Sequence, residues 1–241
     1  MSTTPQTALI LGATGQVGSC LLKELLASPH FARVGEFGRR LTSLDGPTTG
    51  KDKLEQKTID FENVDAAGLR EGNWNVVFIA LGTTAKAAGS SAAFERIDRE
   101  YVINAARAAK TDSPQRLIYV SVSMGADVKS SFLYPRSKGL TEEGLASLGY
   151  EDTIIFRPGF LLGTNRPEYP LLVKCAGAIT GILSRVSSNV GIDIATLAKS
   201  ILLAGKNGSA ALAHATKAGK DGEQFTLIDN SGALALANQF Q

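Results

Sequence analysis

The sequence predicts an α/β fold built on a doubly wound parallel sheet, and three observations support this prediction. Residues 8–11 form a short apolar run without a helical stripe, as expected of a central strand buried on both faces. The run leads directly into three glycines and then into a helical pattern over residues 17–26. Short apolar runs then alternate with helical patterns as far as residue 157, and this alternation implies parallel strands joined by right-handed crossovers.

The three glycines, Gly12, Gly15 and Gly18, lie where the first strand meets the first helix. Gly12 permits a tight turn, Gly15 lets the backbone approach a phosphate, and Gly18 allows close packing of the helix on the sheet. The amides at the start of the helix, together with its dipole, form a site for the pyrophosphate of a dinucleotide. Such a turn can also be purely structural, but the strand before it and the helix after it favour dinucleotide binding by a Rossmann-type fold.

The remaining elements are predicted from the apolar pattern. Further strands are expected over residues 34–37, 57–60, 76–81, 117–121 and 153–156, and helices over 64–70, 92–110 and 133–148. The longest helix is expected to bury one stripe, formed by Phe94, Ile97, Tyr101, Ala105 and Ala108. Because ligands bind at the carboxyl ends of the strands in an open parallel sheet, the unusual residues that follow the strands are expected to form one site.

Length and composition indicate one globular unit. The chain has 241 residues, of which 44% are hydrophobic, and it can bury one sizeable core. We therefore expect a single domain over residues 1–241, with a cofactor-binding core at 1–157 and a small C-terminal substrate-side region at 158–241. The net charge of +2 is too small to imply a nucleic acid or an anionic membrane as partner.

The sequence also bears on metals and on location. The two cysteines and two histidines form neither a disulfide framework nor a metal pattern, so no metal site is expected and a reducing compartment fits. Residues 1–6 do not resemble a signal peptide. The longest apolar run lies within 170–183 and is shorter than the roughly 20 residues that span a bilayer, so we expect a core or dimer helix there. These features predict a cytoplasmic protein without a transmembrane segment.

The end of the second predicted strand indicates which dinucleotide binds. An NAD site would place Asp or Glu there for the ribose 2′-hydroxyl, whereas this chain has Arg39 and Arg40, two cations suited to a 2′-phosphate. We therefore predict NADP(H); the alternative is a pair of solvated surface arginines. Asp60 is placed either to accept a hydrogen bond from the adenine amino group or to cap the next helix. Leu81 and Gly82 are expected to pass under the cofactor ribose.

The candidate catalytic residues are Ser123, Tyr134 and Lys138. Tyr134 and Lys138 are four residues apart on a predicted helix, so the ammonium can lie beside the phenol. A neighbouring cation and the positive nicotinamide ring favour the phenolate, which lets Tyr134 exchange the carbonyl proton while hydride moves. Lys138 can also hold the ribose hydroxyls. Ser121 shares a strand face with Ser123, and we prefer Ser123 for the substrate oxygen because it lies nearer the strand's carboxyl end.

A Tyr and a Lys at this spacing also occur by chance on ordinary surfaces, but several further motifs accompany them here. In chain order these motifs are GATGxxG, FGRR, IDF, LGTT, FxxIDREY, VSVSMGAD, SSFLYPRSKG and FRPGFLLG. Over residues 9–166 the series resembles the atypical short-chain dehydrogenases of the HIV Tat-interacting protein 2 and fungal Fmp52 family.

The resemblance implies an NADPH-binding Rossmann fold with a Ser-Tyr-Lys set, which falls here on Ser123, Tyr134 and Lys138. It also implies a set of cofactor-binding residues. These are Thr14, Gly15, Gln16 and Val17 at the phosphates, Arg39 and Arg40 at the 2′-phosphate, and Leu161 and Arg166 over the cofactor.

Three functions fit these observations. The first is NADPH-dependent reduction of a small carbonyl compound, which the complete Ser-Tyr-Lys set favours. The alternatives are a redox sensor that binds NADPH without turnover, and an isomerase or cyclase on the same fold. The resemblance to the fungal proteins also suggests peripheral attachment to the mitochondrial outer membrane as an alternative location. Homodimer formation stays open, and the sequence does not identify the substrate.

Overall fold

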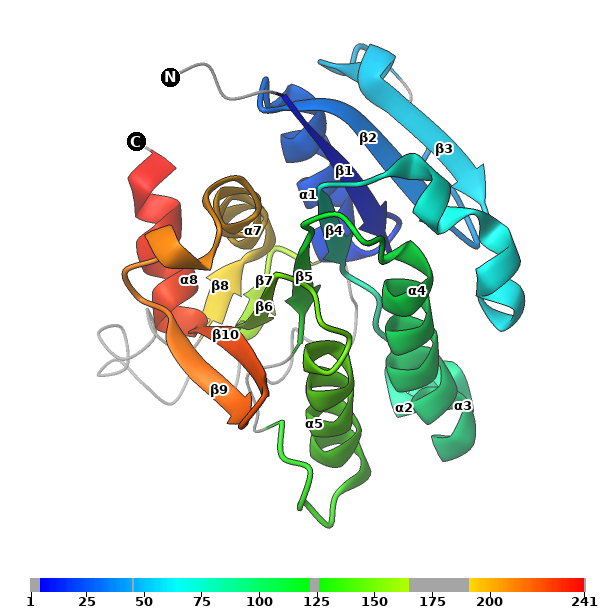
Figure 1. The fold of residues 1–241 in the computed structure, drawn as a ribbon, viewed down its shortest axis with the longest axis vertical. Coiled ribbons are helices and arrows are strands. Elements are labelled where there is room, and N and C mark those ends of the chain that lie inside the picture. Colours follow the sequence, from blue (N-terminus) through cyan, green and yellow to red (C-terminus); the bar gives the residue numbers. More distant parts are fainter. Residues whose placement is uncertain (1–4, 45, 122–125, 165–190, 241) are drawn as a thin grey trace.

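A computed structural model of the chain describes residues 5–44, 46–121, 126–164 and 191–240. Its central feature is an eight-stranded sheet with the order β3-β2-β1-β4-β5-β6-β10-β9 (Figure 1). Neighbouring strands pair in parallel except β10 and β9, which form an antiparallel pair at one edge. The strand order reverses between β1 and β4, and ligands bind at such switch points in open α/β sheets. The prediction of a Rossmann-type, doubly wound sheet is confirmed.

The strands and helices have the following bounds. Strands β1 to β6 span Gln6–Leu11, Phe31–Gly38, Leu54–Thr58, Val76–Ile79, Arg116–Val120 and Asp152–Arg157, and β9 and β10 span Thr216–Lys220 and Glu223–Asp229. A separate two-stranded parallel sheet consists of β7, Phe160–Leu162, and β8, Gly191–Asp193. Helices α1 to α5 span Gln16–Ala27, Ala85–Ala88, Ser91–Glu95, Tyr101–Ala109 and Leu133–Ala146, and α7 and α8 span Ile194–Asn207 and Asn230–Ala237. Two 3₁₀ segments, Phe61–Ala67 and Leu69–Gly72, follow β3.

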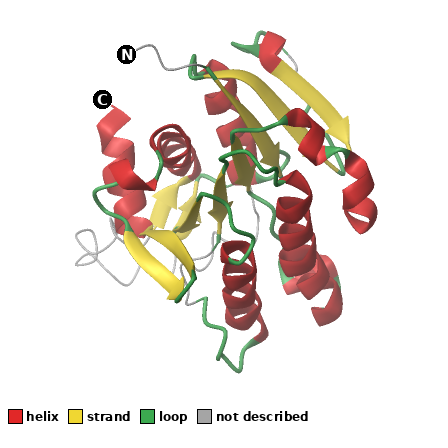
Figure 2. Cartoon of the chain, viewed as in Figure 1, coloured by secondary structure: helices red, strands yellow, loops and turns green. Residues whose placement is uncertain are grey.

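Helices cover both faces of the sheet (Figure 2). On one face α1, α7 and α8 bury apolar side chains such as Leu21 and Ile201 against the strands. On the other face α4, α5 and the 3₁₀ segments do the same with residues such as Val102. Successive residues of β1 point to opposite faces, so that Ile10 joins the first core and Leu9 the second. A strand with a core on each side needs apolar residues throughout, which explains the unbroken run at 8–11.

The third strand spans residues 54–58, so the prediction of 57–60 was wrong in its bounds. This strand lies at the edge of the sheet and most of its side chains are exposed, so it carries no apolar pattern. Ile59 is buried but follows the strand, and it donates its amide proton to Gly38 O. Asp60 caps the next segment by accepting a hydrogen bond from Glu62 N at 3.0 Å. Of the two roles considered for Asp60, the capping role is therefore observed.

The helix predicted over 92–110 is interrupted by a π-helical turn, Arg96–Glu100, between α3 and α4. A π turn has a wider hydrogen-bond spacing than an α-helix and rotates the residues that follow it. As a result Asp98 and Val102 are fully buried, whereas Ile97 and Tyr101 of the predicted stripe are half-buried, and Tyr101 still packs against the core. The extra residue in the turn thus brings a carboxylate into the protein interior.

The region after Arg157 supplies elements that the sequence did not reveal. Strand β10 pairs with β6, and helices α7 and α8 complete the layer that contains α1. None of the helices in the described ranges has the length and hydropathy needed to cross a bilayer. The predicted helix at 170–183 lies outside the described residues.

Candidate functional site

The glycine turn after β1 is shaped by close backbone contacts. Gly12 has a φ of +92°, and a Cβ atom there would lie 2.7 Å from the carbonyl carbon of Ala80, just beyond β4. A Cβ at Gly18 would overlap the Gly12 carbonyl oxygen. Gly15 is the N-cap of α1, and among the described residues no side chain caps this helix. The turn therefore leaves the start of α1 as a cradle that fits a phosphate group.

The neighbouring residues Thr14 and Gly15 are exposed on this turn, Gln16 is half-buried, and Val17 is buried in the core beneath it. A phosphate at the start of α1 would meet the exposed side of the turn. The structure thus brings together the four residues that the sequence assigns to the phosphates, three of them accessible and one anchoring the helix to the sheet.

The end of β2 carries the two arginines expected at the 2′-phosphate. Arg39 and Arg40 are both exposed directly after Gly38. The loop beyond them is tied back to the strand by the buried Glu36 carboxylate, which accepts hydrogen bonds from the amide and hydroxyl of Thr42, each at 2.7 Å, and from Gln56. The loop that carries the arginines is therefore fixed at both ends.

Tyr101 on α4 lies close to this arginine loop. Its hydroxyl donates a hydrogen bond to Glu62, which raises the pKa of Tyr101, while the positive charges of Arg96 and Arg39 oppose this rise. Arg39 therefore contributes to the electrostatic environment of Tyr101. An adenosine phosphate bound at the end of β2 would meet the same group of side chains.

Lys138 lies at the centre of the site, at the carboxyl ends of β4 and β5. Its ammonium is 2.8 Å from Asp98 Oδ2 and donates a hydrogen bond to the Tyr119 hydroxyl at 3.0 Å. Lys138 is only 3% exposed and Asp98 is fully buried. Burial alone would lower the pKa of Lys138, but the neighbouring Tyr119, Asp98 and Tyr134 raise it well above its ordinary value. These neighbours therefore favour the charged form of the lysine.

Tyr119 shares this environment. Burial raises the pKa of the Tyr119 phenol to about 12, against the opposing charge of Lys138, so this tyrosine keeps its proton at neutral pH. Asp98 also accepts a hydrogen bond from Thr83 N at 3.1 Å, and a Cβ at Gly82 would lie 3.9 Å from the Lys138 nitrogen. The loop after β4, with the exposed Gly82 and the half-buried Leu81, thus runs directly past the lysine.

Tyr134 is one helical turn before Lys138 on α5, as the spacing predicts. The Lys138 nitrogen is 6.0 Å from the centre of the Tyr134 ring, and the ring stacks on Phe94 with a centroid distance of 5.5 Å. Tyr134 is 37% exposed, so a bound molecule can reach its phenol, whereas Lys138 lies in the interior. Pro135 occupies the first turn of α5, where its missing amide proton does no harm.

Of the two candidate serines, the structure describes Ser121 but not Ser123. Ser123 and Arg166 lie outside the described residues. The Ser121 hydroxyl lies 2.6 Å from Glu142 Oε1, to which it donates a hydrogen bond. Since a hydroxyl has one proton, Ser121 cannot donate to a substrate oxygen while this bond stands. Leu161 lies half-buried on β7, in the small second sheet.

Glu142 is itself buried and binds Arg157, whose Nε lies 3.0 Å from Glu142 Oε1. Arg157 is the last residue of β6, so this second ion pair, like the first, lies at the carboxyl ends of the strands. Sequence reasoning missed Asp98, Tyr119 and Glu142. The signals for Asp98 were its place in the motif FxxIDREY and an acidic residue inside an otherwise helical apolar pattern, whereas Tyr119 and Glu142 have ordinary positions on a strand and a helix.

Comparisons with known proteins identify the family. A family described as NAD(P)H-binding matches residues 12–180. Protein HTATIP2 of Rattus norvegicus is 36% identical over 165 residues, which cover 68% of this chain and 66% of the rat protein. Protein FMP52-1, mitochondrial, of Scheffersomyces stipitis is 40% identical over 168 residues, which cover 69% of this chain and 72% of that protein.

The chain belongs to the HTATIP2 and Fmp52 family of NAD(P)H-binding proteins. The resemblance drawn from the motifs is therefore confirmed. The chain spans about two thirds of the rat relative's length. Several members of the family are named as mitochondrial proteins.

Solved structures share the fold. The reductase domain of PhqB from Penicillium fellutanum matches with a TM-score of 0.63 at 14% identity, over 86% of this chain and 66% of that one. The Bordetella bronchiseptica enzyme WbmH in complex with NAD+ matches with a TM-score of 0.59 at 17% identity, over 85% of this chain and 73% of that one. At these identities the likeness concerns the fold alone.

Proposed function

We propose that this protein is an NADPH-dependent carbonyl reductase of the short-chain dehydrogenase type, with Tyr134 as its acid and base. One observation carries the proposal: an accessible phenol and a buried, charged ammonium share one face of α5 at the carboxyl ends of the strands. A protein that only bound a dinucleotide would have no need of this pair. Such chemistry requires a hydride donor, and the glycine cradle and the family's NAD(P)H-binding character support the binding of one.

Each residue has a defined task in this proposal. NADPH, when bound, supplies the hydride that reduces the carbonyl carbon. The Tyr134 hydroxyl gives its proton to the carbonyl oxygen, so that an alcohol forms, and it regains a proton from solvent. Ser123 donates a hydrogen bond to the same oxygen. The positive charge of Lys138 acts on the Tyr134 phenol. Lys138 also lies close enough to Gly82 to reach a ribose that passes over this loop.

The cofactor is bound by further residues. We assign the diphosphate to the turn from Gly12 to Val17 and the 2′-phosphate to Arg39 and Arg40. Leu81 and Gly82 lie under the ribose, Asp60 borders the adenine, and Leu161 with Arg166 closes over the cofactor. Residues 1–157 form the cofactor-binding part of one domain, and 158–241 form its substrate side. We further infer that the protein works in the cytoplasm or, since several relatives are named mitochondrial, peripherally on the mitochondrial outer membrane.

The experiment is to follow NADPH oxidation with a panel of aldehydes and ketones, using the wild type and Tyr134→Phe. This substitution removes one oxygen, so NADPH affinity is expected to stay the same while turnover falls by about 10²-fold or more. Tyr150→Phe is the matched control, because its hydroxyl binds Ala106 O, away from Lys138. Wild-type turnover by the Tyr134→Phe protein would rule out this mechanism. Tight NADPH binding without turnover on any carbonyl compound would favour the sensor.

A further inference from the structure

The ion pair between Lys138 and Asp98 is unusual in its burial, since its two side chains are 4% and 0% exposed. The desolvation of two buried charges offsets most of their attraction, so such a pair is weak evidence for stability. The carboxylate is also divided between two partners. Its Oδ2 faces Lys138 at 2.8 Å and its Oδ1 accepts the Thr83 amide proton at 3.1 Å. Asp98 thus connects the lysine to the loop that carries Gly82.

The π-helical turn is what brings the carboxylate there. Asp98 lies in the middle of Arg96–Glu100, and its own carbonyl oxygen lies 3.3 Å from the Thr141 hydroxyl on α5, which shares its proton between this oxygen and Ser137 O at 2.8 Å. Backbone and side chain of Asp98 are therefore both joined to α5, at Thr141 and Lys138. The turn is fixed against the helix that carries Tyr134.

The charges around Tyr134 can be named from each packed element. Lys138 comes from α5, Asp98 from the π turn and Tyr119 from β5, while Glu142 lies one turn further along α5 and is paired with Arg157. An isolated ammonium beside a phenol favours the phenolate. A carboxylate 2.8 Å from that ammonium offsets part of this effect, because the two charges have opposite sign and their separation is less than half the 6.0 Å between the ammonium and the Tyr134 ring.

We propose that Asp98 is a positioning residue that fixes the Lys138 ammonium and offsets its charge, so that Tyr134 keeps its proton at neutral pH and the site works in the direction of carbonyl reduction. The direction rests on the proposed function, because only a reductase needs Tyr134 as a proton donor. The charge effect on Tyr134 is independent of turnover. It can therefore be measured in the free protein.

The experiment is an ultraviolet titration of phenolate absorbance in the wild type, Asp98→Asn, Asp98→Glu and Lys138→Gln. Each protein is measured with and without Tyr134→Phe, so that the difference isolates Tyr134. In Asp98→Asn the Tyr134 titration is expected to move to lower pH by about half a unit or more, because the ammonium loses its counter-charge. Lys138→Gln is expected to move it to higher pH, and Asp98→Glu, which keeps the charge, to leave it in place.

The control is Asp152→Asn, which removes a carboxylate paired with Arg116 far from Tyr134 and is expected to leave the Tyr134 titration unchanged. If Asp98→Asn does not fold, Asp98→Ser, which also removes the charge, takes its place and is expected to show the same shift to lower pH. An unchanged titration in Asp98→Asn, or an equal shift in Asp98→Glu, would overturn the proposal. For active protein, the high-pH loss of reductase rate is expected to move with the titration. A shifted titration in a protein that reduces no carbonyl would support the role of Asp98 and reject the reductase.

Discussion

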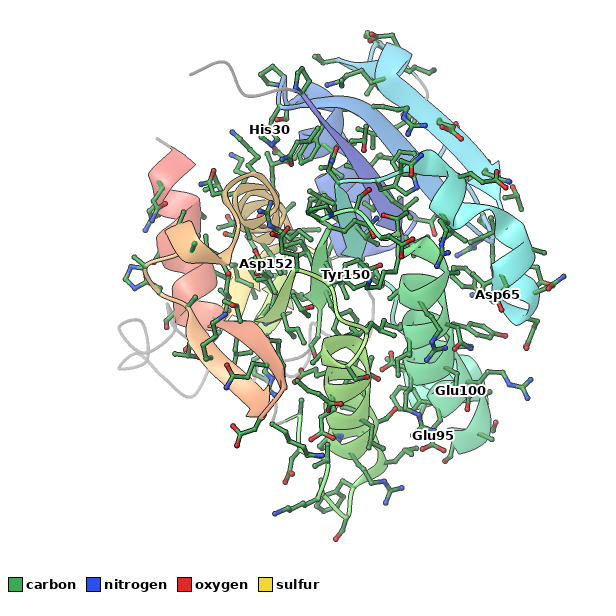
Figure 3. The ribbon with its side chains drawn as sticks, in the orientation of Figure 1. His30, Asp65, Glu95, Glu100, Tyr150 and Asp152 are labelled. Atoms are coloured by element: carbon green, nitrogen blue, oxygen red, sulfur yellow. The ribbon has the colours of Figure 1, made fainter. Side chains whose placement is uncertain are left out.

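The two ends of the sheet treat buried polar groups in different ways. At the amino ends of the strands, Gln115 binds the carbonyl oxygens of Trp74 and Ala109 and the amide of Thr111, so each contact satisfies backbone next to a strand. Arg116 and Asp152 form a partly exposed ion pair at the same end, and Figure 3 labels Asp152 there. At the carboxyl ends, two ion pairs with at least one fully buried member, Lys138–Asp98 and Glu142–Arg157, connect side chains on different elements. Polar groups at the amino ends satisfy the backbone next to the strands. Those at the carboxyl ends fix side chains of the candidate site relative to one another.

The sharpest way to break this comparison is to remove charges from each end. Lys138→Met leaves Asp98 buried without a counter-charge, which is expected to lower the free energy of unfolding by about 3–5 kcal/mol in urea denaturation. The double variant Lys138→Met with Asp98→Leu is expected to regain part of this loss, because removing both buried charges outweighs the loss of the acceptor for Thr83 N. Both variants are expected to lack reductase activity, because both lack Lys138.

The control pair is Arg116→Met alone and together with Asp152→Leu. The single change is expected to lose about 1–2 kcal/mol, and the double change to lose more, since Ser209 N also donates to Asp152. A Lys138 and Asp98 double variant that stayed as unstable as Lys138→Met would show that the buried pair has a structural role, and the contrast between the two ends would disappear.

Gly18→Ala tests the glycine cradle. The new methyl group would overlap backbone atoms of Gly12, which cannot move without opening the turn. We expect a loss of about 2 kcal/mol in stability and no detectable NADPH binding by fluorescence. Gly144→Ala in α5 is the control, because its methyl group would meet only the flexible end of Ile103 and alanine favours a helix. NADPH affinity equal to the wild type in Gly18→Ala would contradict the cradle.

Arg39→Ala sharpens the assignment of NADP(H). We expect NADPH affinity to fall about tenfold, equivalent to about 1.4 kcal/mol, while NADH affinity stays the same, because only NADPH carries the 2′-phosphate. Fluorescence titrations with both cofactors measure this. Arg70→Ala, which changes an exposed arginine after β3, is the control. Equal losses for the two cofactors would remove the phosphate clamp.

The smallest effect concerns His30, which directly precedes β2 at the amino ends of the strands and is labelled in Figure 3. Burial lowers the pKa of His30 below its ordinary value, with smaller contributions from Lys206 and Arg116. The unfolded chain therefore binds a proton more readily, so stability is expected to fall by a few tenths of a kcal/mol as pH drops below about 6.5. Urea denaturation of His30→Gln is expected to show a flatter dependence over this range. An identical slope in both proteins would mean that His30 is not perturbed.

The sequence predicted the sheet well because apolar runs and glycine turns have local causes. It failed at β3, whose exposed edge position removes the apolar pattern, and at Asp98, whose burial depends on one extra residue in a helical turn. The pair Tyr134 and Lys138 could be predicted from a four-residue spacing. The contacts of Lys138 with Asp98 and Tyr119 could not, because they join residues 40 and 19 positions away through the packing of separate elements.

The two outer strands of the sheet have a consequence for how the protein behaves at high concentration. β3 and β9 each present unpaired backbone on one side, a surface on which another chain's strand could add. Both strands are largely exposed and carry lysines, Lys57 on β3 and Lys217 and Lys220 on β9. Charged side chains at such edges oppose the growth of intermolecular sheets. The edge lysines therefore act against strand-to-strand association, and concentrated samples are expected to stay free of β-rich aggregates.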